Sequence, residues 1–189
     1  MRRRIVLAVA VAGLALQACA VGGPPQSAPD HRAAIRQMAS DTLAQLYQSY
    51  PGTQPTVQSA AGYAVFSDIG MKMFYGGAAH GGGIAVNNAT KQSTFMKMIE
   101  LQPGYGFGVE NFRNVFIFDT AAALNEFVNS GWEFGANAMA AAQGGGQGGS
   151  AAGAVTVSPG VTMYQLTQEG AIAGVSITGA KYYKDDTLN

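Results

Sequence analysis

The chain of 189 residues has enough apolar side chains for the core of one folded domain and too little positive charge to attract nucleic acid. Hydrophobic residues make up 48% of it and charged residues 12%, and 11 basic side chains balance 11 acidic ones. Beyond residue 4 the chain has no run of Lys or Arg that could neutralise a phosphate backbone. We therefore do not expect nucleic acid among its partners.

The first twenty residues, MRRRIVLAVAVAGLALQACA, have the order of an export signal. Three arginines precede twelve apolar or small residues, 5–16, and small residues then surround a cysteine. At about 1.5 Å per residue, a helix of that length reaches roughly 18 Å, well short of the roughly 30 Å hydrocarbon core of a bilayer. Residues 1–18 are therefore predicted to be a signal peptide and not a membrane span.

Cys19 is the only cysteine, so neither an intramolecular disulfide nor a Cys-rich zinc site can form. It ends the run LQAC, residues 16–19, which resembles the lipobox of bacterial lipoproteins. The resemblance implies that a lipoprotein signal peptidase cuts before Cys19, which is then acylated and anchors the chain durably. Ala20 follows instead of Asp, which in enteric-type bacteria favours the outer membrane, facing the periplasm. The alternative is an inert cysteine near a cleavage site.

Residues 19–29 are small, rich in Gly and Pro and nearly uncharged, which is typical of a flexible tether. Removal of residues 1–18 takes away three of the 11 basic residues, so the mature chain carries a net charge of about −3. Any attraction to anionic lipid must then be local to one part of the surface. We expect residues 30–189 to form a single domain.

Residues 30–50 predict an amphipathic helix. Pro29 or Asp30 can begin it, and a Pro-Gly pair ends it. Helices that insert into membrane surfaces are rich in Lys and Arg, but Arg32 and Arg36 are the only cations on its polar face, so we expect it to pack on the rest of the domain. The apolar residues at spacings of three and four are Ile35, Met38, Ala39, Leu43, Leu46, Tyr47 and Tyr50.

After Pro55 the chain changes to short β-type runs separated by Gly, Pro and Asn. The first runs are GYAVFSDI, KMFYGGAAHG, GIAVNN, QSTFMKMIEL, GYGFGVE and NVFIFD, and Asn87-Asn88 is a predicted turn. A helix follows, in which Asp119 or Thr120 caps AAALNEFVNSG and Gly131 is the stop. Later strands are predicted in AGAVTVS, VTMYQLT and GAIAGVSITGAKYY.

This order of elements predicts an α+β domain, because the strands follow one another with short turns instead of alternating with helices. We expect an amphipathic N-terminal helix packed on a mainly antiparallel, glycine-rich, strongly curved or barrel-like sheet, with one further internal helix. Glycines inside strands mark bends or places where another backbone or a ligand comes close. Residues 74–88, FYGGAAHGGGIAVNN, are the densest such segment.

That segment lacks both common phosphate-binding motifs. A dinucleotide fingerprint leads from a strand into a helix, but here the glycines lead into the β-type run Ile84-Ala85-Val86. A P-loop needs Lys and then Ser or Thr after its last glycine, and Ile84 follows Gly83. We therefore attribute the glycines to strand curvature and close strand packing, and predict no cofactor.

Five segments follow one another in a distinctive order: AGYAVF (61–66), GGAAHGGGIAV (76–86), GYGFG (104–108), the helix that leads into WEFGA (132–136), and EGAIAGVS (169–176). Together they resemble the SYLF domain, also called the Ysc84-type domain. The resemblance covers roughly residues 33–186. It implies binding of membrane lipid, including phosphoinositides, and bacterial members are commonly exported lipoproteins. The actin binding of one eukaryotic branch is not carried over. QGGGQGGS, residues 143–150, departs from the family pattern and is typical of a flexible insertion.

The sequence offers little for catalysis. His31 and His80 are the only histidines, and no HExxH, nucleophile elbow or Cys-His pair is present. A set of Ser67, Asp68 and His80 can be written down, but a polar turn and a loop histidine explain these residues as well. We predict no catalytic residue, no enzyme activity and no metal site.

A lipid site would draw on few cations. We predict that Arg32, Arg36, Lys72 and Arg113 bind lipid head groups, each contributing about 1 kcal/mol near a membrane surface. The other cations of the β region are Lys97, Lys181 and Lys184, and scattered, solvated lysines are the alternative.

Three classes of function stay open. The first is an envelope lipoprotein whose SYLF-like domain binds anionic phospholipid or phosphoinositide-like head groups. The second is a structural or protein-interaction lipoprotein with an envelope protein partner and no lipid pocket. The third is an enzyme that acts on lipid.

Overall fold

The computed structural model describes residues 27–131, 133–135, 154–167, 170–171 and 179–189, although the side chains at 69–76, 102–110, 134–135 and 170–171 are not described. The elements are α1 (Ala28–Ser49), α2 (Thr53–Ser59), β1 (Gly62–Asn87), β2 (Ser93–Phe118), α3 (Ala121–Asn129), β3 (Glu133–Gly135), β4 (Ala154–Ser158), β5 (Val161–Thr167), β6 (Gly170–Ala171) and β7 (Gly179–Lys184).

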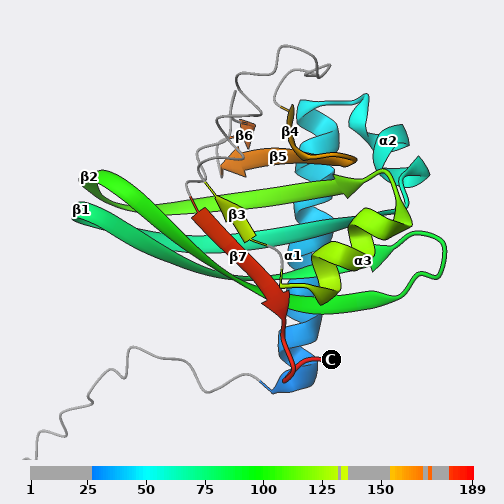
Figure 1. Cartoon of the computed structure of the whole chain (residues 1–189), viewed down its shortest axis with the longest axis horizontal. Coiled ribbons are helices and arrows are strands. Elements are labelled where there is room, and N and C mark those ends of the chain that lie inside the picture. The colour runs from blue at the N-terminus through cyan, green and yellow to red at the C-terminus, as the bar shows by residue number, and fades with distance from the viewer. Residues whose placement is uncertain (1–26, 132, 136–153, 168–169, 172–178) are drawn as a thin grey trace, which may run out of the picture.

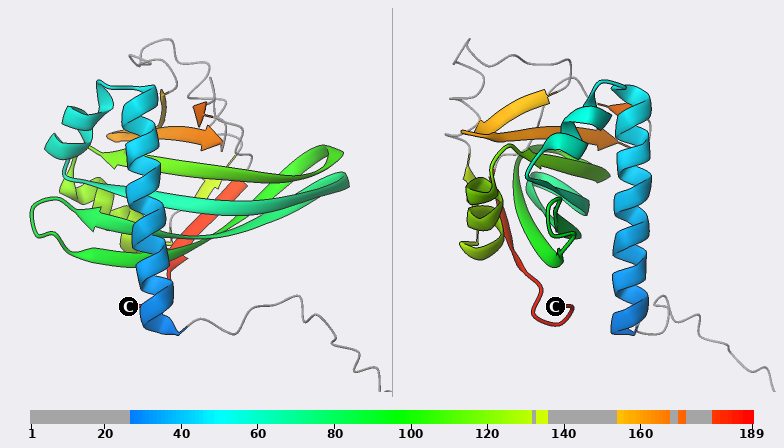
Figure 2. Two further views of the ribbon diagram at one scale, coloured as in Figure 1. Left: turned by 180° about the vertical axis from the view of Figure 1, so that it is seen from behind. Right: turned by 90° about the vertical axis from the view of Figure 1, so that its right-hand side faces the viewer.

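One curved antiparallel sheet lies between helices (Figure 2). The strand order is β3-β7-β2-β5-β4, with β1 also paired to β2 and β6 to β5. Helix α1 crosses one face, here called the outer face, and α3 covers the other, the inner face (Figure 2). This arrangement confirms the predicted α+β fold with its N-terminal helix packed on a strongly curved sheet.

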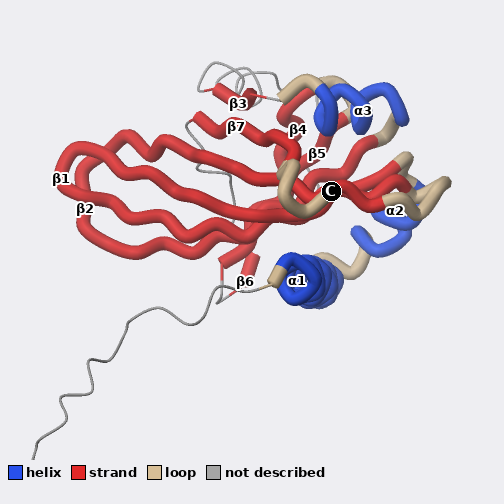
Figure 3. The backbone as a smooth tube through the Cα atoms, turned by 90° about the horizontal axis from the view of Figure 1, so that it is seen from below, coloured by secondary structure: helices blue, strands red, loops and turns tan. Residues whose placement is uncertain are grey.

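Two long strands, β1 and β2, make up most of the sheet and are paired over their whole length. The pairing runs from Gly62 opposite Phe118 to Val86 opposite Ser93, with one shift of register between Phe74 and Gly76. A straight strand of 26 residues at about 3.3 Å each would be roughly 86 Å long, far more than the width of a small domain. Each strand instead turns back on itself near its middle (Figures 1 and 3). The six short β-type runs that the sequence predicts in this region are therefore two long strands, each bent back on itself.

Glycines let the two halves of β1 touch through their backbones. A Cβ atom on Gly83 would overlap the carbonyl oxygen of Val65 and the ring of Phe66, and one on Gly81 would overlap the carbonyl oxygen of Ser67. Any larger residue would push the halves apart. The glycine-rich segment is thus a place where two stretches of backbone pack closely, as the sequence analysis predicts.

The inner face holds an aromatic core under α3. The ring of Phe66 lies 4.8 Å from that of Tyr182 and 6.0 Å from that of Phe127, which comes from α3. Tyr182 is fully buried, and its pKa is raised well above the ordinary value, first by burial and then by the nearby carboxylates Glu100 and Asp68. The buried aromatic rings are Phe66, Phe116, Phe118, Phe127 and Tyr182.

The outer face packs against α1. Ile35, Ala39 and Leu46 recur at helical spacing and are each less than 7% exposed. They contact a second apolar cluster that contains Val65, Ile84, Phe95, Val115 and Ile117 of the sheet. The predicted packing of this helix on the domain is confirmed.

The helix ends follow local capping chemistry. Ser27 caps α1 by accepting a hydrogen bond from the Asp30 amide at 3.4 Å, so the helix begins slightly earlier than predicted. Thr120 accepts one from the Ala123 amide at 3.2 Å, and Gly131 follows α3 with a φ of 65°, both as predicted.

Helix α2, in contrast, is an element that the sequence analysis missed. It has only seven residues, with Pro55 in its first turn, where a proline is tolerated. Two turns are too short to show a periodic pattern.

The contact at Gly83 generates a stability prediction. We expect Gly83→Ala to lower the free energy of unfolding by about 1–3 kcal/mol or more, because overpacking forces the backbone to move. Gly82→Ala is the matched control, since its Cβ would lie 3.8 Å from the Ile35 Cδ1, an ordinary contact, and should change stability by less than about 1 kcal/mol. Urea unfolding of the two variants measures the difference. Equal stabilities would contradict the close backbone contact.

Candidate functional site: two hollows beside the first helix

Two hollows lie where the first turns of α1 pass the sheet and the C-terminal residues. The larger, of about 490 Å³, is here called the arginine hollow, and its lining includes Arg32, Arg36, Phe95 and Lys184. The smaller, of about 340 Å³, is called the histidine hollow, and its lining includes His31, Ile35, His80, Lys97, Ile99 and Asp185. The chain end lies close to the start of α1, at the bottom of Figure 1.

The arginine hollow brings together cations from two elements. Arg32 and Arg36 stand one turn apart on α1, so their side chains share a face of the helix. The guanidinium carbon of Arg36 lies 5.0 Å from the centre of the Phe95 ring, a cation–π contact. Lys184 ends β7 and donates a hydrogen bond from its Nζ to the Asn129 Oδ1 at 2.7 Å. Among its described lining residues the hollow has no Asp or Glu side chain.

The C-terminal residues 185–189 form a wall of both hollows. The side-chain amide of Asn189 bonds to the backbone of Phe95 as a neighbouring strand would. Its Oδ1 accepts a hydrogen bond from the Phe95 N–H at 2.9 Å, and its Nδ2 donates one to the Phe95 carbonyl at 2.8 Å. The Arg32 Nε donates to the Leu188 carbonyl at 2.7 Å. The tail therefore joins α1 to the start of β2, and Arg32 has a structural contact as well as a charge.

Asp185 fixes the other end of the tail. Its side chain is 3% exposed and pairs with the Lys97 Nζ at 2.9 Å, and it accepts hydrogen bonds from the Thr187 hydroxyl at 2.6 Å and the Thr187 amide at 3.0 Å. Burial raises the pKa of this carboxyl, but the hydrogen bonds from Thr187 and Lys97 outweigh burial, so the net pKa is lowered.

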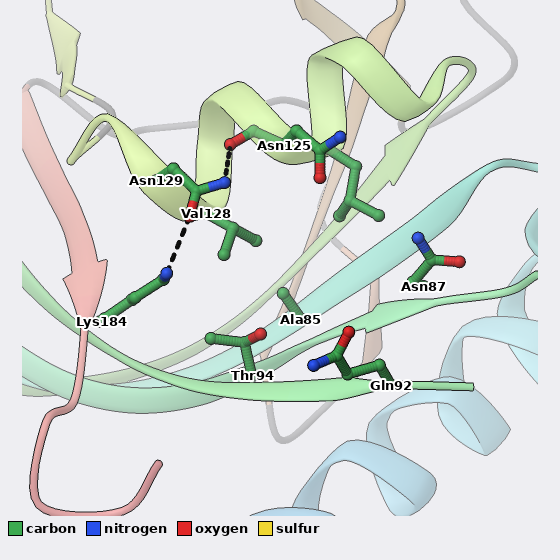
Figure 4. A pocket seen from close by; sticks show the side chains of 9 residues that line it. Ala85, Asn87, Gln92, Thr94, Asn125, Val128, Asn129 and Lys184 are labelled. Atoms are coloured by element: carbon green, nitrogen blue, oxygen red, sulfur yellow. Dashed lines mark hydrogen bonds between the residues drawn. The ribbon is translucent and has the colours of Figure 1, made fainter. Parts of the chain in front are cut away.

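A third, smaller hollow lies between α3 and the two long strands (Figure 4). It measures about 190 Å³, and polar side chains such as Asn87, Gln92 and Asn125 line it. Lys184 is its one cation among the described lining residues and is bound to Asn129 across it (Figure 4). Its small size makes it a weaker candidate for a ligand than the other two hollows.

The predicted head-group residues do not all meet. Arg32 and Arg36 share the arginine hollow. Arg113 pairs with Ser67 in β1, so both halves of β1 separate it from the part of β2 that lines the hollows. The backbone of Lys72 pairs with Gly108, and its side chain lies outside the described residues.

Other predictions fall outside the described part of the chain. These are Cys19 and its acylation, the tether up to residue 26 and the insertion at 143–150. The sequence did not identify the other residues of the arginine hollow. Lys184 was one of several cations of the β region, and residues 185–189 have no pattern that indicates a binding site.

Among the described residues, every helix is too short or too polar to cross a membrane.

The chain's two histidines, far apart in sequence, meet in the histidine hollow. The set of Ser67, Asp68 and His80 does not assemble, because Asp68 is buried on the inner face whereas the exposed His80 lines the hollow on the outer face. Within the described ranges no three His, Cys, Asp or Glu side chains gather in a way that could hold a metal ion.

The fold and the hollows define an α+β domain with a cationic hollow beside its first helix. Residues 100–189 match the family described as "Ysc84: Las17-binding protein actin regulator". The chain is 30% identical over 166 residues to "Beta cell expansion factor A" of Aeromonas veronii, an alignment that covers 87% of this chain and 61% of that protein. The chain thus matches the model of the Ysc84-type, or SYLF, family over residues 100–189, in agreement with the resemblance that its motifs predict. It spans less than two thirds of that relative's length.

The environment of Asp185 generates a prediction about pH. A lowered pKa in the folded state contributes stability above the ordinary carboxyl pKa of about 3.9, and this contribution is lost as the pH falls through the folded value. We expect Asp185→Asn to lower the free energy of unfolding at pH 7 by about 1–3 kcal/mol and to flatten the acid loss below about pH 4. Unfolding curves between pH 2.5 and pH 7, at roughly half-unit steps, measure both effects.

Asp186→Asn is the control for this experiment, because Asp186 is the exposed neighbour in the same tail. It should change neither the stability at pH 7 nor the acid profile. If the two variants lose stability alike, the ion pair of Asp185 with Lys97 does not hold the tail.

Proposed function

We propose that this protein is an envelope lipoprotein whose folded domain binds the anionic head groups of membrane lipids in the arginine hollow. One observation carries the proposal: Arg32, Arg36 and Lys184 line one hollow without an Asp or Glu side chain among its described lining residues. A mature chain with a net charge of about −3 attracts anions only where such a local excess exists.

The chemistry of the two arginines suits a phosphate group. A guanidinium presents several N–H donors in a fixed plane that matches phosphate oxygens, and it stays charged at all physiological pH values. Arg36 is exposed and uses the face of its guanidinium on Phe95, which leaves the N–H groups at the edge for a ligand. We infer that Arg36 is the main contact and that Arg32, held by Leu188, contributes chiefly charge.

The position of the hollow agrees with an N-terminal anchor. Ser27, the cap of α1, follows the predicted acylated Cys19 by eight residues, which span at most about 29 Å. Arg32 lies in the second turn beyond that cap. Acylation of Cys19 would therefore keep the hollow within reach of the bilayer, and Ala20 after Cys19 supports an outer-membrane location facing the periplasm.

A protein-interaction lipoprotein is the second candidate. Leu101 is 64% exposed and Ile99 is 38% exposed on the outer face of β2, which favours a contact with another apolar surface. The family description also names a protein partner. We propose no catalytic activity.

Co-sedimentation of residues 20–189 with vesicles tests the lipid proposal. We expect binding to vesicles that contain anionic lipid, weaker binding at high salt, and none to neutral vesicles. Arg36→Gln should weaken binding about fivefold, which corresponds to about 1 kcal/mol for one cation at a membrane surface. The Arg32→Gln/Arg36→Gln double variant should weaken it about thirtyfold if the two contributions add.

Lys181→Gln is the matched control, since Lys181 is an exposed cation that does not line the hollow and pairs with Glu133 at 2.7 Å. This variant should bind as the unchanged domain does. Equal losses in Arg36→Gln and Lys181→Gln would show only a diffuse charge effect. The absence of binding to any vesicle would favour the protein-interaction candidate.

A further inference from the structure

We propose that the histidine hollow is a separate site for a fatty acid anion, a single-chain amphiphile whose carboxylate is bound by His31, His80 and Lys97. This inference goes beyond head-group binding in the arginine hollow and does not depend on it. It rests on the way in which three elements place basic and apolar side chains around one hollow of about 340 Å³.

The helix contributes one basic and one apolar side chain, and the two strands contribute two basic side chains and one apolar side chain. On α1, His31 and Ile35 are one turn apart and so lie on the same face. In the sheet, His80 of β1 pairs directly with Ile99 of β2. Lys97 lies two residues before Ile99 and shares its face of the strand. All five residues line the hollow.

The charges in the hollow favour an anion. The ionisable side chains that face it are His31, His80, Lys97, Tyr183 and Asp185. Asp185 is already paired with Lys97 and bonded to Thr187, so it does not oppose an anion as a free carboxylate would. His31 also lies in the first turn of α1, where the helix dipole adds partial positive charge. Protonation of the two histidines would leave the hollow with a net positive charge.

The rest of the lining favours a hydrocarbon chain. Ile35 is 6% exposed and Ile99 is 38% exposed, and Gly82, on the same face of β1 as His80, leaves its part of the wall without a side chain. A few polar groups in an otherwise apolar hollow are the usual composition of a small-molecule site. Leu101 continues the same face of β2 and is 64% exposed, but it lies outside the hollow.

The volume distinguishes a fatty acid from a two-chain phospholipid. A hollow of about 340 Å³ is near the lower end of the range of roughly 300–1,000 Å³ for ligand sites. It therefore fits the carboxylate and the first part of one chain. Because a protonated imidazole attracts a carboxylate more strongly than a neutral one, binding of a carboxylate should strengthen as the pH falls.

Calorimetric titration of residues 20–189 with dodecanoate, below its micelle concentration and without vesicles, tests the proposal. We expect saturable binding of one dodecanoate per chain, about tenfold tighter at pH 6 than at pH 8. The His31→Asn/His80→Asn double variant should lose about tenfold at pH 6 and should show no further pH dependence. Both histidines are exposed, so this variant should fold.

Ile99→Ser and Leu101→Ser form a matched pair for the apolar part. Both residues are exposed on the same face of β2, but only Ile99 is among the residues that line the hollow. Ile99→Ser should weaken binding at least about fivefold, because it removes apolar contact and adds a hydroxyl. Leu101→Ser should weaken it less than about twofold, and dodecanol and acetate should both bind much more weakly than dodecanoate.

Several results would overturn the proposal. These are dodecanol that binds as tightly as dodecanoate, equal losses in Ile99→Ser and Leu101→Ser, or an unchanged affinity in the double histidine variant. Arg36→Gln keeps the histidine hollow intact and should retain dodecanoate binding. Loss of dodecanoate binding in that variant would show that the two hollows are not separate sites. Failure to bind vesicles would leave this inference standing.

Discussion

The backbone contact between the two halves of β1 determines the shape of this molecule. At Gly81 and Gly83 a carbonyl oxygen of the other half occupies the space that a Cβ atom would need. Because β2 is paired to β1 along its whole length, the bend in one strand is also the bend in the other. The resulting curvature gives the sheet one face filled by the aromatic cluster and α3, and another that receives α1.

The candidate sites lie on the part of the outer face that α1 leaves uncovered. The helix buries Ile35, Ala39 and Leu46 on the sheet. The C-terminal tail, residues 185–189, fills part of the remaining surface near the start of α1. Hydrogen bonds to Phe95 and the ion pair with Lys97 hold that tail in place. The hollows that remain have an excess of basic side chains, although the whole sequence has as many acidic as basic residues. The charge distribution is therefore the strongest link between this fold and an anionic ligand.

The sequence predicted the features that depend on local physics. The apolar spacing of the N-terminal helix, the cap at Thr120 and the stop at Gly131 were correct, since each depends on residues within one or two helical turns. The strand composition and the glycines predicted a curved antiparallel sheet. They did not show that six runs form two strands, because continuity through a bend depends on pairing with a distant partner.

The candidate site was predicted only in part, for the same reason. Arg32 and Arg36 are one helical turn apart, so their proximity could be predicted from the sequence. Lys184 and the tail reach them only through long-range contacts, such as that of Arg32 with Leu188, 156 residues away. His31 and His80 likewise meet only because the sheet passes the start of α1.

Photo-crosslinking tests whether an anionic head group binds in the arginine hollow. A phospholipid that carries a photoreactive group on its head would be activated in vesicles with residues 20–189 bound, and the labelled peptides identified by mass spectrometry. We predict labels in residues 92–95 and 184–189 and in the first turns of α1, reduced in Arg36→Gln. Labels concentrated around Arg113 or Leu101 instead would contradict the account.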